Sequence, residues 1–307
     1  MLTIFTTGKS FRGHNGIIQR NALKSWTLLH PDVEVILFGD DEGAAEVASD
    51  LRIKHVPYVE KHKSGMKYLR SFFDPAQQLA RHPIVCYINC DIVLTSDFRA
   101  AIERLENLHP KFVMVGRRWD LDVQLPLRFE NPDWEVDLRR LTLSKGNQRA
   151  PNWIDYFVFP RGLYFSQLPG FVIGRVCWDN WLVWRARESG LPLIDASEAV
   201  VAVHQNHDYG YHPAGAAGIW SDELAQRNLI LAGGKFHLCT IDDATHSLGP
   251  AGERRTAKHF FRPLRRLLRT TWEVAWLALL DWTRPMRRVL RLRQDTLRSL
   301  AARWRRG

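Results

Sequence analysis

The amino-acid sequence predicts an α/β domain with a mostly parallel sheet flanked by helices, followed by a C-terminal basic amphipathic helical tail. Two observations lead to this prediction. In residues 1–252, short apolar and β-branched runs alternate with stretches of helical length, as in parallel strands joined by helices. In residues 253–307, arginines alternate with leucines and tryptophans at helical spacing. A chain of 307 residues has room for one large domain and such a tail.

The first elements form a β-α-β unit. Leu2–Thr7 is a strand-like run, a helix is expected over Ile17–Leu29, and a second strand over Val33–Phe38. The sequence has no G-x-G-x-x-G after the first strand and no G-x-x-x-x-G-K-[ST], so neither a dinucleotide-binding Rossmann domain nor a P-loop is indicated.

The next elements continue the alternation of strands and helices. We expect, in order, a strand over Ile53–Val59, a helix over Phe72–Arg81, an apolar central strand over Ile84–Leu94, a helix over Asp97–Leu108 and a strand over Phe112–Gly116. Residues 117–152 are polar and contain prolines, which predicts an irregular insertion. A helix is expected again over Asp179–Ser189, with Gly190 as its stop.

The composition, with 45% apolar and 25% charged residues, is that of a soluble globular protein. No apolar run approaches the roughly 18 residues that a membrane-spanning helix requires. Residues 1–7 lack the features of a signal peptide, so we expect a cytoplasmic protein. The 4 cysteines form no C-x-x-C pair, and we expect buried, reduced thiols.

The basic charge of the chain is confined to the tail. Residues 253–307 hold 16 of the 43 Lys and Arg but only 4 of the 33 Asp and Glu, so the rest of the chain is slightly acidic. A basic helix with a Trp and Leu face favours peripheral attachment to an anionic membrane surface, here the inner face of the membrane. The alternative is a helix packed on the domain with its arginines in solvent. Binding to nucleic acid is disfavoured, because the remaining chain shows no recognition module.

Two polar side chains end the apolar run that begins at Ile84. Asn89 and Asp91 are two residues apart, so they share one face of a strand. Ligands of open α/β sheets bind at the carboxyl ends of the strands, where a carboxylate holds a divalent cation against a diphosphate. The alternative is that Asp91 caps a turn, with Asp97 capping the next helix.

These residues resemble the motif of nucleotide-sugar glycosyltransferases of the GT-A fold, in the nucleotide-diphospho-sugar transferase superfamily. In that family a DxD motif follows the central strand, and its last carboxylate binds Mn²⁺ or Mg²⁺ with the sugar diphosphate. Here the triplet is Asn89-Cys90-Asp91. The resemblance covers about Leu2 to Gly234 and implies a divalent-cation cofactor, with Asp91 as a metal ligand and Asn89 beside the nucleotide.

Two later clusters place lone carboxylates among aromatic rings, which suits a sugar site. Asp155 and Arg161 lie in residues 152–162, and Trp178, Asp179 and Asn180 lie in residues 174–181. The resemblance implies that Asp179, at a helix start, binds or deprotonates the acceptor hydroxyl; alternatively it only interacts with the helix dipole. We expect Asp155, Trp178 and Asn180 to bind substrate, and Arg161 to hold phosphate or form a surface ion pair.

A histidine cluster follows the apolar run Val200–Val203. Histidine is a common metal ligand, and the resemblance implies that His204 or His207 completes the metal site; a structural hydrogen bond is the alternative. The spacing is not that of an HExxH zinc hydrolase, and no cysteine lies nearby to suggest structural zinc.

Residues near the N-terminus are expected to hold the nucleotide. Thr6 and Thr7 end the first strand, Arg20 lies at the start of the following helix, and Asp40 follows the second strand. In the family that the sequence resembles, the ends of these two strands hold the nucleoside. The alternative for Asp40 is a plain turn.

The sequence therefore predicts a metal-dependent glycosyltransferase that moves a sugar from a nucleotide-diphosphate donor to a hydroxyl acceptor. Residues 1–116 would bind the nucleotide, and residues 117–252 would bind the acceptor and complete the metal site. The expected acceptor is a cell-envelope or lipid-linked glycan. Two alternatives remain: a nucleotidyltransferase, for which the loop Gly8–Gly13 is a faint version of the triphosphate-binding loop, and a non-catalytic membrane-associated sugar-binding protein.

Overall fold

The computed structural model describes residues 1–208 and 215–256. The amphipathic helix expected in the tail, and the membrane attachment inferred from it, concern residues 257–307 and lie outside the described part of the chain. Within the described part, no helix is long and apolar enough to cross a membrane. All 4 cysteines are buried and free, as expected.

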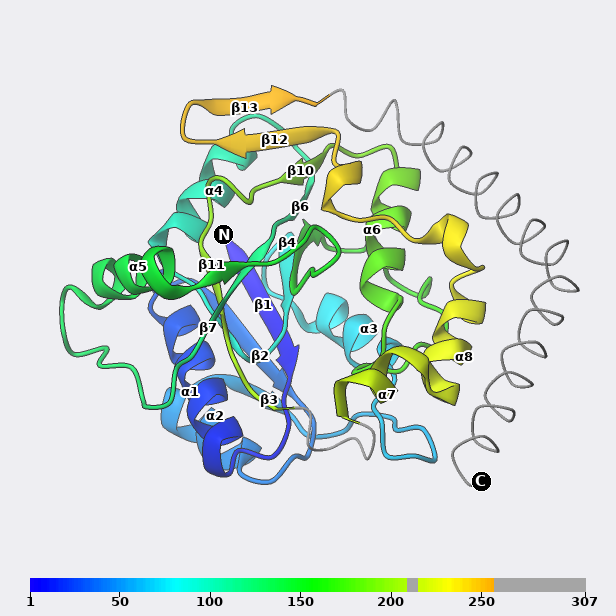
Figure 1. Cartoon of the computed structure of the whole chain (residues 1–307), viewed down its shortest axis with the longest axis horizontal. Helices are drawn as coiled ribbons and strands as arrows, with labels where there is room; N and C mark the ends of the chain where they lie inside the picture. Colours follow the sequence, from blue (N-terminus) through cyan, green and yellow to red (C-terminus); the bar gives the residue numbers. More distant parts are fainter. Residues whose placement is uncertain (209–214, 257–307) are drawn as a thin grey trace, which may run out of the picture. The chain divides into compact units, whose positions relative to one another are not determined.

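The chain forms a mixed α/β domain, which confirms the predicted fold class (Figure 1). The first half begins with parallel strands in the order β3-β2-β1-β4. Its elements are β1 (Leu2–Thr7), α1 (Gly13–Thr27), β2 (Glu34–Phe38), α2 (Ala44–Leu51), β3 (Lys54–Val56), α3 (Arg70–Leu79) and β4 (Ile84–Ile88). The helix α2 was not expected from the sequence, and α1 begins four residues earlier than expected.

The large sheet has nine strands in the order β13-β12-β10-β6-β9-β4-β1-β2-β3. The strand β9 runs antiparallel to its neighbours β4 and β6, and β13 runs antiparallel to β12. The added elements are α4 (Ser96–Glu106), β6 (Val113–Val115), β9 (Tyr156–Pro160), β10 (Leu193–Asp195), β12 (His246–Gly249) and β13 (Gly252–Arg255). The sheet therefore continues to Arg255 and includes the first three residues of the expected tail, 253–255.

A second sheet of four strands lies beside the large one, in the order β5-β11-β7-β8. It contains β5 (Ile92–Val93), β7 (Arg118–Leu121), β8 (Asn147–Gln148) and β11 (Ala202–Gln205), with the helix α5 (Trp134–Lys145) between β7 and β8. Two expectations are corrected here. The apolar run Ile84–Leu94 is two strands in different sheets, because the chain turns at Asn89–Asp91, and residues 117–152 contain regular elements. The helix α5 buries only Leu138 and Thr142, so its apolar pattern is weak.

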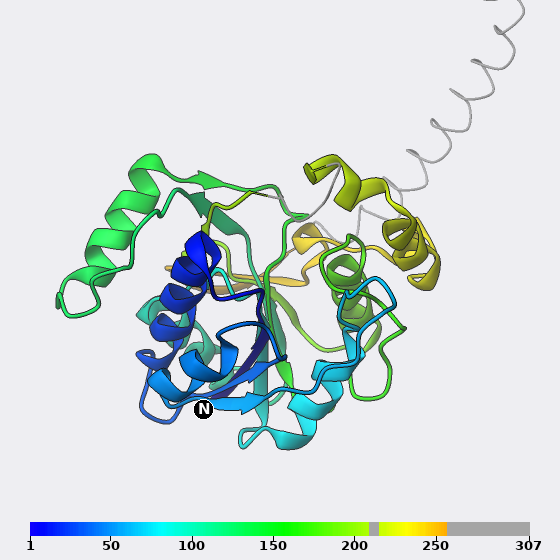
Figure 2. The same ribbon diagram turned by 90° about the horizontal axis from the view of Figure 1, so that it is seen from below.

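Helices cover both faces of the large sheet (Figures 1 and 2). Strand residues alternate between two apolar clusters: Val35 and Leu37 pack with α1, α2 and α4, whereas Ile36 and Phe38 pack with α3 and α6. The remaining elements are α6 (Trp178–Glu188), α7 (Gly215–Ser221), α8 (Glu223–Leu231) and the 3₁₀ turns Lys235–His237 and Ile241–Asp243. Residues of α1 and of α7 line the space at the carboxyl ends of β1 and β4.

Candidate active site

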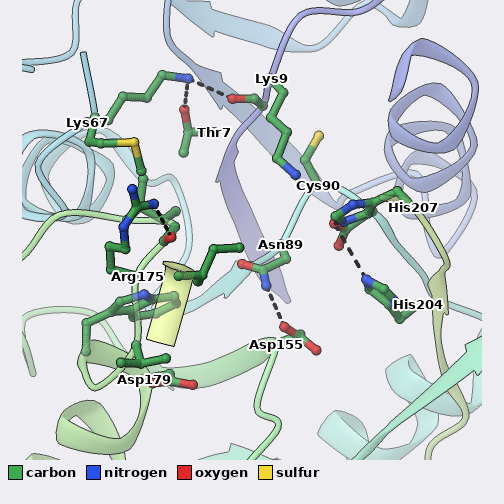
Figure 3. Close-up of a pocket in the computed structure, with 18 of the residues that line it drawn as sticks. Thr7, Lys9, Lys67, Asn89, Cys90, Asp155, Arg175, Asp179, His204 and His207 are labelled. Atoms are coloured by element: carbon green, nitrogen blue, oxygen red, sulfur yellow. Dashed lines mark hydrogen bonds and ion pairs between the residues drawn. The ribbon is translucent and has the colours of Figure 1, made fainter. Parts of the chain in front are cut away.

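A cavity of about 590 Å³ lies at the carboxyl ends of β1 and β4. Its walls come from the loop after β1, the turn between β4 and β5, the loops before β9 and α6, the end of β11, and α7 (Figure 3). The volume is within the range of small-molecule sites. The cavity brings together residues from both expected halves of the domain.

Three potential metal ligands meet on one side of this cavity. Asp91 Oδ2 lies 3.2 Å from His207 Nε2 and 3.9 Å from His204 Nε2, and one ligand atom of each residue lies within 4.8 Å of the others. The register of the small sheet produces this arrangement, because β11 pairs His204 with Ile92, the residue after Asp91. The three metal ligands named from the sequence are therefore neighbours in space.

The electrostatics of this cluster fit a divalent cation. Burial alone would raise the pKa of Asp91, but His204 and His207 hold that pKa well below its usual value, so the carboxylate is ionised. Its Oδ1 is buried and has no hydrogen-bond partner among the described residues. A set of one carboxylate and two imidazoles suits Mn²⁺ better than Mg²⁺, which prefers oxygen ligands.

Asp120 lies behind the imidazole of His204, at ion-pair distance. His204 Nδ1 lies 3.1 Å from Asp120 Oδ1, which leaves Nε2 directed towards Asp91. Asp120 is itself held by Arg118 Nε at 2.8 Å and Arg149 Nε at 3.2 Å. A carboxylate behind a ligating histidine fixes its tautomer and makes it a stronger ligand.

We expect the substitution Asp120→Ala to weaken Mn²⁺ binding about tenfold to a hundredfold, because His204 would lose its orienting partner. Titration with Mn²⁺ alone, followed by the electron paramagnetic resonance of the free ion, measures this affinity. Asp137→Ala removes an exposed carboxylate from α5 and serves as the control. An unchanged affinity in Asp120→Ala would show that His204 does not need this contact.

Asn89 lines the cavity beside the cluster, but both ends of its amide are engaged within the protein. Its Oδ1 accepts a hydrogen bond from Tyr87 Oη at 2.7 Å, and its Nδ2 donates to Asp155 Oδ1 at 2.5 Å. Asp155 Oδ2 also accepts from Arg118 Nη1 at 2.8 Å. An aspartate at position 89 would place two carboxylates in contact, whereas the Asn89 amide donates a hydrogen bond to Asp155.

Asp179 lines the same cavity from the first turn of α6. Cys177, two residues before Asp179, has a left-handed backbone (φ 83°), which turns the chain into the helix. Burial, reinforced by the charge of Asp155, raises the pKa of Asp179 to about 7. Its Oδ1 is buried without a hydrogen-bond partner among the described residues. A carboxyl group poised near neutral pH is suited to proton transfer.

The other residues expected to bind substrate near Asp179 also line the cavity. The ring of Trp178 packs edge-on against Tyr87 at 5.5 Å. Asn180 Nδ2 donates to the carbonyl of Cys239 at 2.8 Å, and Arg175 Nε pairs with Asp222 Oδ2 at 2.7 Å. These contacts hold the loop before α6 against the segments that follow α7.

A buried lysine that was not expected from the sequence, Lys67, lines the cavity at the ends of β1 and β2. Lys67 Nζ donates to Thr7 Oγ1 at 2.9 Å and to the Gly8 carbonyl at 2.7 Å, and it forms an ion pair with Asp41 (Figure 3). Burial lowers the pKa of Lys67, although Asp41 opposes this effect. The lysine thus ties together the loops after β1 and β2.

We expect Lys67→Ala to lower the free energy of unfolding by about 3 kcal/mol, because it leaves the partly buried Asp41 without its cation. The matched control is Lys61→Ala, which breaks the exposed pair with Asp40 and should cost at most about 1 kcal/mol. Urea denaturation of both variants provides the comparison. Equal losses would contradict the difference in burial on which this prediction depends.

Four of the residues named from the sequence do not reach the cavity. Thr6 is fully buried and donates to the Ile88 carbonyl at 2.7 Å. Arg20 donates to the Phe11 carbonyl at 2.9 Å, and Asp40 is an exposed partner of Lys61, while the neighbouring Asp41 lines the cavity. Arg161 binds the Ala80 carbonyl at the opposite edge of the sheet, because β9 runs antiparallel to β4.

Comparisons with known proteins give matches among solved structures alone. No protein-family model matches the chain, and no curated protein matches it. The fold does have similar counterparts among nucleotide-sugar glycosyltransferases.

Three solved structures illustrate this similarity. One is S. aureus TarS 1–349 in complex with UDP-GlcNAc (TM-score 0.46, 9% identity, 67% of this chain and 58% of that chain). Another is M. tuberculosis glucosyl-3-phosphoglycerate synthase with Mg²⁺ and UDP (TM-score 0.46, 14% identity, 76% of this chain and 80% of that chain). The third is mannosyltransferase PcManGT from Pyrobaculum calidifontis with GDP-Man and Mn²⁺ (TM-score 0.43, 16% identity, 69% of this chain and 58% of that chain). This chain spans less than two thirds of the length of TarS 1–349. The similarity concerns the fold, so the chemistry has to be read from the residues of this chain.

Proposed function

We propose that this protein is a metal-dependent glycosyltransferase that moves a sugar from a nucleotide-diphosphate donor to a hydroxyl acceptor. The observation that supports it best is the presence, in one cavity, of the Asp91, His204 and His207 cluster and of Asp179. A cation site and a carboxyl group with a pKa near 7 are the two groups that such a transfer needs.

Each part of the cavity has a role in this proposal. Asp91, His204 and His207 would hold Mn²⁺ or Mg²⁺, which when bound neutralises the charge on the leaving diphosphate. Lys9 is half-buried and places its amine on the same side; partial burial lowers the pKa of this amine, and the charge of Asp91 opposes that effect. Thr7 and Asp41 lie at the ends of β1 and β2, where they would contact the nucleoside.

In the proposed transfer step, Asp179 accepts the proton of the acceptor hydroxyl. The acceptor oxygen forms a bond to the anomeric carbon, while the bond from that carbon to the diphosphate oxygen breaks and its electron pair leaves with the nucleoside diphosphate. The proton of the acceptor hydroxyl passes to the Asp179 carboxylate. In a reaction that retains the anomeric configuration, Asp179 would instead only position the acceptor.

We also propose where the protein acts and on which class of acceptor. The concentration of arginines in residues 253–307 supports attachment to an anionic membrane surface at the cytoplasmic face, beside a lipid-linked or cell-envelope glycan. Cosedimentation with vesicles tests this: binding to phosphatidylglycerol vesicles but not to phosphatidylcholine vesicles is expected, and equal recovery with both would contradict it.

The experiment that tests the activity class is a thermal-stability series with UDP, GDP, CDP and TDP, each with and without Mn²⁺. At a hundred times Kd a ligand adds about 2.7 kcal/mol to the native state, so Tm should rise by about 5 °C for one nucleotide only when metal is present. Asp91→Ala should abolish that rise. If no nucleotide raises Tm of the wild-type protein, the proposed function is wrong.

A further inference from the structure

Two tryptophans that the proposed transfer step does not use form part of the cavity wall. Trp153 lies in the loop before β9, and Trp220 lies on α7 with 48% of its surface exposed. Their ring centroids are 5.5 Å apart and their planes are inclined by 70°. An exposed tryptophan ring is costly to solvate, so its position in a cavity wall indicates a surface that a ligand covers.

The ring of Trp153 is held in place from the small sheet. The guanidinium carbons of Arg118 and Arg149 lie 4.7 Å and 4.4 Å from its centroid. Both arginines are themselves anchored by Asp120. Two anchored cations over its ring hold Trp153 rigidly, and the exposed ring of the pair is that of Trp220, which packs against this fixed support. Rigid surfaces lose little entropy when a ligand binds.

The polar groups around the two rings are those that recognise sugar hydroxyls. Asn152 and Asp155 come from the same loop as Trp153, and Asp179 lines the same cavity. Aromatic faces stack on the C–H faces of a pyranose, while carboxylate and amide oxygens accept hydrogen bonds from its hydroxyls. We propose that Trp153 and Trp220 form an acceptor subsite that binds a pyranose ring of a glycan. The acceptor role of this subsite rests on the proposed function. The binding of a sugar to the two tryptophans can be measured whether or not that function is correct.

The position of the pair favours a sugar over the nucleobase of the donor. Figure 3 shows Thr7 and Lys67 at one end of the cavity and Asp155 and Asp179 at the other. Trp153 belongs to the Asp155 end, because Arg118 contacts both its ring and the Asp155 carboxylate. The pair thus lines the same cavity as Asp179, the carboxyl group proposed to take the acceptor proton, and Trp153 lies at the Asp155 end of it.

Saturation-transfer NMR on the full chain tests this subsite with a panel of free trisaccharides of glucose, galactose, mannose, rhamnose and N-acetylglucosamine. At least one is expected to show saturation of its ring C–H protons in the wild-type protein. Trp220→Ala should weaken that binding about tenfold, whereas Trp220→Phe should retain most of it. Tyr58→Ala, which removes an 80% exposed aromatic residue outside the cavity wall, should leave binding unchanged. Unchanged Tm values would show that the variants remain folded.

Three results would overturn the inference. They are a wild-type protein that binds no sugar of the panel, a Trp220→Ala variant that binds sugars as the wild type does, and a Trp220→Ala variant in which UDP or GDP binding with Mn²⁺ is weakened instead. The last would assign the pair to the nucleobase. Failure of the nucleotide test with sugar binding intact would reject the glycosyltransferase proposal but keep the sugar subsite.

Discussion

The substitution Asp91→Asn is expected to abolish metal-dependent nucleotide binding and to lower kcat/KM for sugar transfer by at least about 10³-fold. Asp91 supplies the only carboxylate of the ligand cluster found among the described residues, and its ionised form is favoured by both imidazoles. A cation at a developing diphosphate contributes several kcal/mol to the transition state, and 1.4 kcal/mol corresponds to a factor of about ten in rate.

The test of Asp91→Asn combines a Mn²⁺ titration with the thermal-stability series. Asn has nearly the shape of Asp, so the fold and the metal-free Tm should change little. Asp32→Asn removes a carboxylate whose side chain is 70% exposed and lies away from the cavity, and it controls for the change of net charge. If Asp91→Asn keeps a metal-dependent rise in Tm, the cation is held elsewhere.

The parts of this site that sequence could predict are the polar residues that directly follow an apolar strand, even where those strands are far apart in the chain. The histidines and the Asn89-Cys90-Asp91 triplet follow apolar strands directly, and strand ends at one edge of a sheet meet in space. Lys67 could not be found in this way. Its partners Thr7, Gly8 and Asp41 lie 60, 59 and 26 residues away, and nothing in its own neighbourhood distinguishes it from a surface lysine.

Arg161 shows the opposite error, in which closeness in sequence was mistaken for closeness in space. It lies six residues after Asp155, within the same aromatic cluster. The strand β9 separates the two, and a rise of about 3.3 Å per residue moves Arg161 roughly 20 Å to the other edge of the sheet. Arg118 and Asp120 were missed for a related reason: the strand that carries them, β7, is only four residues long, so its alternation is too short to stand out.

Asp179→Asn is expected to lower activity and raise stability at the same time. As the base in an inverting transfer, Asp179 contributes about 10² to 10⁴ to the rate, and Asn cannot accept the proton. The activity of the wild-type protein should fall as pH drops below about 7, because the protonated form of Asp179 is then dominant. The charged and titratable groups that face it are Asp155 before β9, Tyr87 on β4 and Cys177 before α6.

The stability gain follows from the raised pKa. Below pH 4 the carboxyl is protonated in both states, and the wild type and the variant should be equally stable. Between about pH 4 and 7 the unfolded chain ionises while folded Asp179 stays protonated, so the free energy of unfolding of the wild type falls as pH rises, and above pH 7 the deficit is constant. About 1.4 kcal/mol for each pH unit between 3.8 and 7 sets an upper limit near 4 kcal/mol.

We expect a gain of about 2 kcal/mol at pH 8, because solvent reaches part of the side chain and Asn loses a favourable first-turn interaction with the α6 dipole. Urea denaturation at pH 4.5 and pH 8 measures it. The control Glu188→Gln changes an exposed carboxylate at the other end of α6 and should alter stability by less than about 0.5 kcal/mol at both pH values. A variant that is inactive but no more stable than the wild type at pH 8 would show that Asp179 is not held in an unfavourable charged state. A variant that is more stable and retains nearly full activity would instead make Asp179 a positioning group, as in a retaining transfer.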